Sequence, residues 1–163
     1  MATEGNNLSE FDKNALPDLT GKKFGIAVSE WNSQITDGLL KGALSGFEQA
    51  GVSIEDIIVK YVPGSFELAL GAKKLIDTFQ LDGVVCLGSV VRGETAHFDY
   101  VCQACAKGIM DVNLSTGVPV AFGVLTDDTQ QQAIDRSGGK HGNKGTEAAV
   151  VVMKMAGFTS SDF

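Results

Sequence analysis

Short apolar runs alternate along the chain with segments in which apolar residues recur every three or four positions. Uninterrupted apolar runs of this length are typical of strands buried on both faces of a parallel sheet. The runs predict four strands: 24–28, 57–62, 83–91 and 118–124. The periodic segments predict amphipathic helices, each burying one apolar stripe. These helices would span Ile35 to Phe47, Phe66 to Phe79, Phe98 to Ile109, a short polar stretch around Ala133, and about 144–155.

The order of these elements indicates the fold. Strand and helix alternate four times, with Gly51 placed to end the first helix and Ser65 to cap the second. This order predicts a flavodoxin-like α/β domain of three layers, α/β/α, with a central four-stranded parallel sheet. We expect an N-terminal arm at 1–20, a single domain at 21–158 and a C-terminal tail at 159–163. Ligands of such sheets bind beyond the carboxyl ends of the strands.

Composition narrows the classes of partner. The 163 residues include 13 Lys and Arg against 20 Asp and Glu, a net charge of −7. The pI near 4.7 argues against nucleic acid and anionic membranes, because the field of the protein repels phosphate. With no secretory signal and no membrane span, we expect a cytoplasmic protein with three free thiols. Cys102 and Cys105 form a C-x-x-C motif within a predicted helix, which favours packing, and no metal-ligand pattern occurs.

Aromatic and polar residues follow the predicted strands. Trp31, the only tryptophan, precedes Asn32 after the first strand, and Phe66 and Glu67 follow the second. A flat ring beside amide and carboxylate groups suits a flat heterocycle, with core packing of each ring as the alternative. His97 opens the helix after the third strand, where an imidazole can move a proton near neutral pH. A helix cap or another structural role is the alternative for His97.

A glycine-rich basic stretch at 136–145 predicts an anion site. It opens with Arg136, one of two arginines, and its ten residues include three cations, four glycines and no acid. Glycines let backbone N–H groups approach an anion, and the N-terminus of the following helix adds a favourable dipole. A small phosphate would fit there, with a solvated turn bearing surface lysines as the alternative. Neither a dinucleotide fingerprint nor a Walker loop is present.

Four motifs occur in order along the chain. They are V-P-G-S-F-E at 62–67, G-S-V-V-R-G-E-T-A-H-F-D-Y-V at 88–101, G-V-P-V-A-F-G-V-L-T at 117–126, and G-N-K-G at 142–145 with Arg136 upstream. Together they resemble the lumazine synthase family over about residues 22–156. The resemblance implies a transferase of riboflavin biosynthesis that condenses 5-amino-6-(D-ribitylamino)uracil with 3,4-dihydroxy-2-butanone 4-phosphate. A Schiff base forms, phosphate is eliminated, and ring closure with loss of water gives 6,7-dimethyl-8-ribityllumazine, without a metal or organic cofactor.

The resemblance also implies roles for individual residues. Trp31 would stack on the pyrimidine, and His97 would transfer a proton. Further contacts to the pyrimidine and its ribityl chain would come from Asn32, Ser65, Phe66, Glu67, Ser89, Val90, Val91 and Phe122. Arg136, which we group with His97 as catalytic, would bind the phosphate together with backbone N–H groups of Glu94 and Thr95. Lys144 lies on the same loop and matches a family lysine.

An assembly is implied as well. Family members form pentamers, and in some members twelve pentamers build a hollow 60-subunit shell, which the short glycine-rich loop of this chain favours. Phe122 and the Arg136 loop would come from one subunit, and Trp31, Phe66 and His97 from its neighbour. The arm would add to a neighbouring sheet edge, and riboflavin synthase is a candidate protein partner. The alternatives are a non-catalytic flavin- or nucleotide-binding module and a cage-forming protein with a vestigial site.

Overall fold

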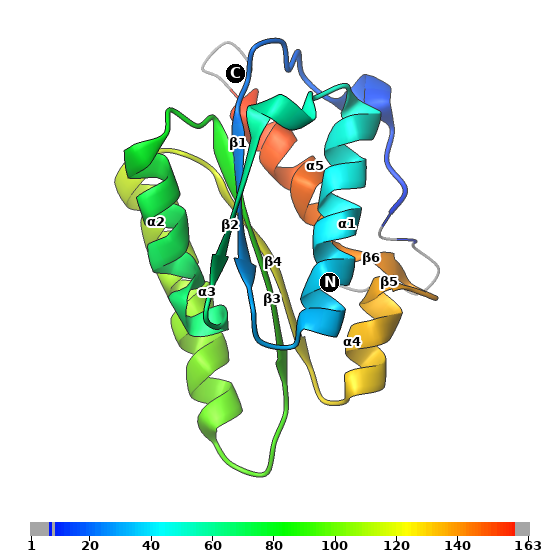
Figure 1. The fold of residues 1–163 in the computed structure, drawn as a ribbon, viewed down its shortest axis with the longest axis vertical. Coiled ribbons are helices and arrows are strands. Elements are labelled where there is room, and N and C mark those ends of the chain that lie inside the picture. The colour runs from blue at the N-terminus through cyan, green and yellow to red at the C-terminus, as the bar shows by residue number, and fades with distance from the viewer. Residues whose placement is uncertain (1–6, 8, 159–163) are drawn as a thin grey trace.

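A four-stranded parallel sheet forms the centre of the molecule (Figure 1). The computed structural model describes residues 7 and 9–158. In their order across the sheet, the strands are β2 (Ile57–Val62), β1 (Phe24–Ser29), β3 (Gly83–Val91) and β4 (Val120–Asp127). Each neighbouring pair is parallel, as the alternation of strand and helix predicts.

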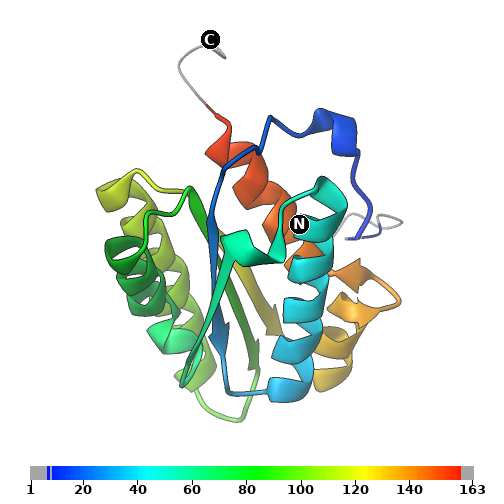
Figure 2. The ribbon, with the colours of Figure 1, turned by 45° about the horizontal axis from the view of Figure 1, so that its top comes forward.

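Helices cover both faces of this sheet (Figure 2). They are α1 (Ser33–Ala50), α2 (Leu68–Thr78), α3 (His97–Thr116), α4 (Gln130–Arg136) and α5 (Lys144–Ala156). Helices α1 and α5 pack on one face, and α2 and α3 on the other, which confirms the predicted three-layer fold. None of the described helices combines the length and the apolar character that a membrane crossing requires.

The core consists of two layers, one on each side of the sheet. Ile26 and Val85 contribute to the layer beneath α1 and α5, whereas the adjacent Ala27 and Cys86 contribute to the layer beneath α2 and α3. Every residue of β1 is buried, which explains why its sequence is apolar without alternation. Cys105 is a buried free thiol of the second layer, and burial raises its pKa to about 12, so packing is its role.

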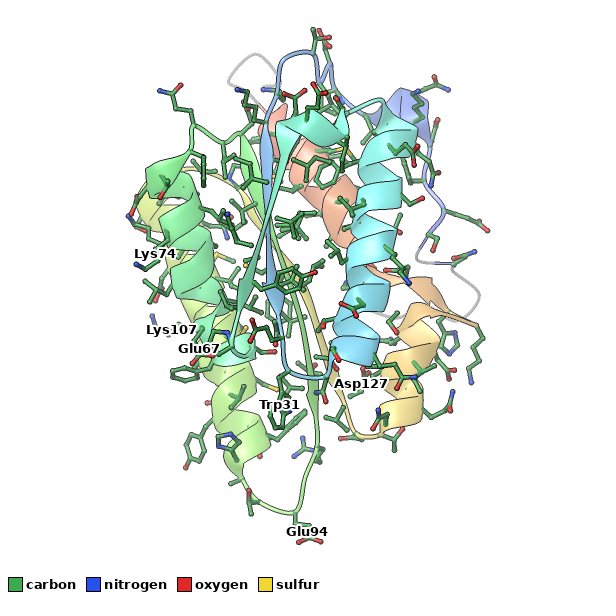
Figure 3. All side chains as sticks on the ribbon, viewed as in Figure 1. Trp31, Glu67, Lys74, Glu94, Lys107 and Asp127 are labelled. Carbon is green, nitrogen blue, oxygen red and sulfur yellow. The ribbon has the colours of Figure 1, made fainter. Side chains whose placement is uncertain are left out.

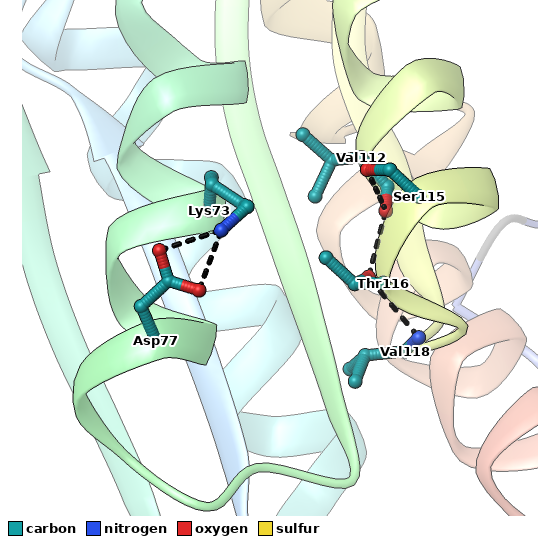
Figure 4. A network of polar contacts seen from close by, with 6 residues as sticks. All are labelled: Lys73, Asp77, Val112, Ser115, Thr116 and Val118. Carbon is teal, nitrogen blue, oxygen red and sulfur yellow. Dashed lines mark hydrogen bonds and ion pairs between the residues drawn. The ribbon is translucent and has the colours of Figure 1, made fainter.

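The fourth strand begins at Val120 and not at residue 118. Pro119 lacks an N–H group and cannot donate to the ladder at that position. The N–H of Val118 donates to Thr116 Oγ1 at 3.2 Å, and that hydroxyl donates to the carbonyl of Val112 at 2.7 Å (Figure 4). Val118 therefore lies in the turn that follows α3, and the strand extends further toward its carboxyl end than the apolar run suggests.

The second helix also differs from its prediction. Ser65–Glu67 form a separate 3-10 turn, η3, and no side chain caps α2, so the prediction that Ser65 is a helix cap is wrong. Ser65 is buried and packs against β3, where a Cβ on Gly88 would lie 2.5 Å from Ser65 Oγ. Gly51, in contrast, ends α1 in the left-handed conformation as expected, with φ 87°.

The predicted arm at 1–20 is only partly described, since residues 1–6 and 8 lie outside the described residues, as does the predicted tail at 159–163. A short 3-10 helix, η1 (Lys13–Ala15), precedes Leu16 and Leu19, which pack half-buried against the layer beneath α1 and α5. A Cβ on Gly157 would collide with Pro17, so the second half of the arm also lies against the end of α5. This half packs on its own chain, and the domain boundaries stay a prediction.

Candidate active site

A hollow of about 660 Å³ opens at the carboxyl ends of β1, β2 and β3, where the fold predicts a ligand site. We call it the aromatic hollow. Its lining comprises Trp31, Asn32, Gly64, Ser65, Phe66, Glu67, Ser89, Val90, Val91, Gly93, Thr95, His97, Phe98 and Val101. The segments that follow three different strands thus meet around one space.

Trp31 stands at the rim of the aromatic hollow on the loop that follows β1 (Figure 3). Its side chain is 72% exposed, so the core-packing alternative does not describe it. The next residue, Asn32, has the left-handed conformation, with φ 60° and ψ 45°, and its Nδ2 donates to the carbonyl of Ser89 at 2.9 Å. Asparagine tolerates this conformation better than most residues. The hydrogen bond ties the Trp31 loop to β3 and fixes where the indole stands.

A second exposed ring and two unpartnered hydroxyl groups belong to the same hollow. Phe66 on η3 is 60% exposed. Ser65 and Ser89 are buried, and neither Oγ atom has a hydrogen-bond partner among the described residues. Buried polar groups are normally paired, so unpaired ones beside exposed aromatic rings indicate a place for a ligand.

His97 is the first residue of α3 and lies exposed on the wall of the aromatic hollow. Its backbone N–H donates to Thr95 Oγ1 at 3.4 Å, and its imidazole has no hydrogen bond to any described residue. The ring is therefore available for proton transfer, and it does not cap α3. Glu94 lies at the tip of the loop between β3 and α3, outside the lining (Figure 3).

A separate hollow of about 480 Å³ lies beyond the end of β4, and we call it the Arg136 hollow. Its lining is polar: Thr126, Asp127, Asp128, Gln132, Asp135, Arg136, Lys140 and His141. None of these described residues also lines the aromatic hollow. The glycine-rich stretch contains no acid, but the fold brings three acids from just upstream beside its cations. Asp127 and Asp128 follow the fourth predicted strand in the sequence, but the composition of the basic stretch does not predict that they lie beside its cations.

Two of these acids have opposite environments. Asp127 is buried, and its Oδ2 atom has no partner among the described residues. Burial raises the pKa of Asp127, Arg136 opposes that shift, and Asp128 adds to it. Asp135 pairs with Lys140 Nζ at 3.0 Å and accepts a hydrogen bond from Gln131, and these contacts lower its pKa. Lys140 is thus paired with Asp135, whereas Arg136 forms no ion pair with a described residue.

The glycine-rich stretch is not a simple loop. Residues 137–143 form a two-stranded antiparallel hairpin, β5 (Ser137–Gly139) and β6 (Gly142–Asn143). Asn143 Nδ2 donates to the carbonyl of Gly38 at 2.8 Å, and Thr146 Oγ1 donates to the carbonyl of Gly42 at 2.9 Å. Asn143 of the G-N-K-G motif and Thr146 just after the motif therefore anchor the hairpin on α1.

Besides Glu94, two predicted site residues lie outside both hollows. Lys144 pairs with Glu147 at 2.8 Å in the first turn of α5. Phe122 lies on the edge strand β4 and is 36% exposed. Alternate residues of a strand share a face, so Phe122 faces the same side as the buried Val120 and Val124. Within one chain, Trp31, Phe66 and His97 line one hollow, whereas Phe122 and Arg136 lie outside it.

The described residues contain no group of three His, Cys, Asp or Glu side chains arranged to hold a metal ion. An exposed indole and an exposed imidazole line the aromatic hollow, whereas an arginine lines the separate polar hollow.

Comparison with known proteins gives one consistent result. The family model described as 6,7-dimethyl-8-ribityllumazine synthase matches residues 21–160. The chain is 54% identical to the 6,7-dimethyl-8-ribityllumazine synthase of Parabacteroides distasonis, over 98% of this chain and 100% of that protein. It is 54% identical to the enzyme of that name from Christiangramia forsetii, over 96% of this chain and 94% of the relative. The enzyme of the same name from Porphyromonas gingivalis is 51% identical, over 96% of this chain and 98% of the relative.

Proposed function

The chain belongs to the 6,7-dimethyl-8-ribityllumazine synthase family, and we propose how its two hollows carry the reaction. The enzyme is a transferase of riboflavin biosynthesis that joins 5-amino-6-(D-ribitylamino)uracil to 3,4-dihydroxy-2-butanone 4-phosphate. An amine of the pyrimidine attacks the ketone, and water leaves as the Schiff base forms. Phosphate is then eliminated, and closure of the second ring releases water again and gives 6,7-dimethyl-8-ribityllumazine.

We propose that the aromatic hollow binds the pyrimidine. Trp31 stacks on the ring, with Asn32 at its edge, and the backbone of Ser89, Val90 and Val91 hydrogen-bonds the pyrimidine. The ribityl chain lies along Ser65, Phe66 and Glu67. The exposed rings and the unpartnered hydroxyl of Ser65 support this arrangement.

His97 is the proposed proton-transfer residue. Schiff base formation and phosphate elimination each require a proton to move to or from a leaving group, and a positioned imidazole does this near neutral pH. Its free ring on the wall of the aromatic hollow supports this role. Most of the acceleration is expected from holding amine and ketone together, which can supply roughly 7–11 kcal/mol.

Arg136 is the proposed phosphate ligand. Its guanidinium would receive the phosphate together with backbone N–H groups of Glu94 and Thr95, and Lys144 would add positive charge nearby. Because the Arg136 hollow and the aromatic hollow share no lining residue, we propose that Arg136 and Phe122 serve the site of a neighbouring subunit. This arrangement requires an oligomer, which we propose to be the pentamer or a shell of twelve pentamers.

Further elements of the proposal concern the surroundings of the enzyme. The free thiols of the described residues support a cytoplasmic location. Riboflavin synthase, which would use the product, is the proposed protein partner. The arm predicted at 1–20 is proposed to add to a neighbour's sheet edge.

The observation that carries the proposal is the separation of exposed rings and His97 from Arg136 on one chain. Complementation tests it. His97→Ala and Arg136→Ala chains are refolded together, and the fluorescence of the lumazine product is followed with the phosphorylated substrate far below its KM, where the Arg136→Ala chain alone is impaired. Random mixing should restore about a quarter of wild-type activity, because one in four neighbouring pairs joins two intact halves. Recovery no greater than that of either variant alone would show that both halves act within one chain.

A further inference from the structure

We propose that Arg92 is a positioning residue, which closes the base of the β3–α3 loop and thereby fixes where His97 stands in the aromatic hollow. This inference rests on the proton-transfer role proposed above for His97. Arg92 is not part of the hollow's lining, although its neighbours Val91 and Gly93 are. Its action on the reaction must therefore pass through other residues.

The side chain of Arg92 contacts two residues just beyond the far end of the loop, in the first turn of α3. The loop spans Arg92 to Ala96, and α3 begins at His97. The guanidinium carbon of Arg92 lies 4.1 Å from the ring centroid of Phe98, and Nη1 donates to Asp99 Oδ1 at 3.2 Å. Phe98 and Asp99 directly follow His97 in the first turn of α3. The first residue of the loop is thus held against the turn that carries the imidazole.

A second pair of contacts ties Arg92 to the end of β4. Its Nε donates to Asp128 Oδ1 at 2.8 Å, and its backbone N–H donates to the carbonyl of Asp127 at 3.0 Å. One planar guanidinium therefore spans two carboxylates and a ring face. A lysine has a single ammonium group and cannot make all three contacts in this geometry.

The loop itself has little else to hold it. Gly93 to Ala96 are exposed, and a Cβ on Gly93 would meet nothing within 4 Å. The ion pairs of Arg92 are also substantially exposed, and such pairs contribute little to folding stability. Their effect is local: small displacements of a reacting group can cost orders of magnitude in rate. Loss of Arg92 should therefore lower turnover without unfolding the protein.

The test compares Arg92→Gln, Arg92→Lys and the control Lys107→Gln, which breaks an exposed ion pair to Asp111 elsewhere on α3. Rates are measured from product fluorescence, and pyrimidine binding from quenching of Trp31, the only tryptophan. We expect Arg92→Gln to lower kcat about tenfold, with both KM values and pyrimidine binding changed less than twofold. Arg92→Lys should lose less, and Lys107→Gln should match the wild type. An unchanged kcat overturns the proposal, and so does a raised KM for the phosphorylated substrate at constant kcat.

Two further measurements separate this proposal from the proposed function. In a His97→Ala background, Arg92→Gln should lower kcat less than twofold, because the residue through which it acts is gone. A tenfold loss in that background shows that Arg92 acts elsewhere and overturns the proposal. Amide hydrogen exchange at 93–97 needs no activity, and it should be faster in Arg92→Gln than in Lys107→Gln. Equal exchange in the two variants overturns the claim that Arg92 holds the β3–α3 loop in place. A wild-type protein that forms no product would overturn the proposed function instead.

If Arg92→Gln does not fold, the two carboxylates that pair with Arg92 are replaced one at a time. Asp99→Asn and Asp128→Asn each leave Arg92 in place and should each lower kcat about threefold. Wild-type kcat in both variants overturns the proposal.

Discussion

The aromatic hollow and the Arg136 hollow are built in different ways. The first lies where three parallel strands end, and its Trp31 loop is tied to the sheet by hydrogen bonds from Asn32 to Ser89 and from Glu30 to Val62. The second stands on a short helix and a hairpin, which are held in place by contacts of Asn143 and Thr146 with α1. The position of the aromatic hollow therefore follows from the sheet itself. The charged half depends on how closely two helices pack, and it should be the more sensitive to changes far from the ligand.

The largest expected effect is on the foundation of the Arg136 hollow. A Cβ on Gly145 would collide with the carbonyl oxygen of Leu39, and neither backbone can easily move. Gly145→Ala should therefore lower the free energy of unfolding by about 3 kcal/mol, measured by chemical denaturation. The matched control is Gly93→Ala in the aromatic half, where a Cβ meets nothing within 4 Å. Equal stability of the two variants would contradict the contrast between the halves.

The next effect separates chemistry from binding in the aromatic half. His97→Ala should lower kcat by about 10²-fold without abolishing turnover, because proton transfer is only one component of the acceleration. Pyrimidine binding, measured from Trp31 quenching, should change less than twofold. A kcat at pH 7 equal to that of the wild type would remove His97 from the mechanism.

A smaller effect is expected from the charged half. Arg136→Ala should raise KM for the phosphorylated substrate about tenfold, since it removes a charge-assisted hydrogen bond. KM for the pyrimidine should stay within twofold. Lys140→Ala is the control, because Lys140 is already paired with Asp135. Equal increases in both KM values would argue that Arg136 does not select the phosphate.

The smallest effect concerns Asp127 and is one of pH. Since burial raises the pKa of Asp127, the folded state favours its protonated carboxyl. The stability that the protonated form contributes is present below pH 3.8 and is lost as the pH rises through the raised pKa. Asp127→Asn should therefore stabilise the protein at pH 7 by about 1 kcal/mol, the low end for an unpaired buried polar group. The gain should shrink in acid. Denaturation at pH 3.5 and pH 7 measures it, and a gain larger in acid would have the wrong sign.

The sequence predicts the sheet and the aromatic hollow better than the charged half. Four apolar runs locate four strands, because buried parallel strands cannot alternate. The ends of those strands then bring Trp31, Phe66 and His97 together. Ser65 was expected to cap a helix, but its hydroxyl faces β3 because the chain turns sharply after β2. Local patterns carry no information about that direction.

The Arg136 hollow shows a second limit. Composition identifies the basic stretch but not the carboxylates that lie beside it. The position of its hairpin depends on hydrogen bonds from Asn143 and Thr146 to α1, which lies about a hundred positions earlier in the chain. Whether two hollows on one chain belong to one site or to two cannot be decided from spacing. The answer depends on the surfaces through which two copies of the chain would contact each other.

The separation of the two hollows also has a consequence for mass action. If each half meets its complement on a neighbour, a lone polypeptide holds no complete catalytic centre, and an open row of subunits leaves one unmatched half at each end. Only a closed ring gives as many working centres as chains. Specific activity should then fall on dilution as rings open, and substrates that bridge the seam should slow that loss.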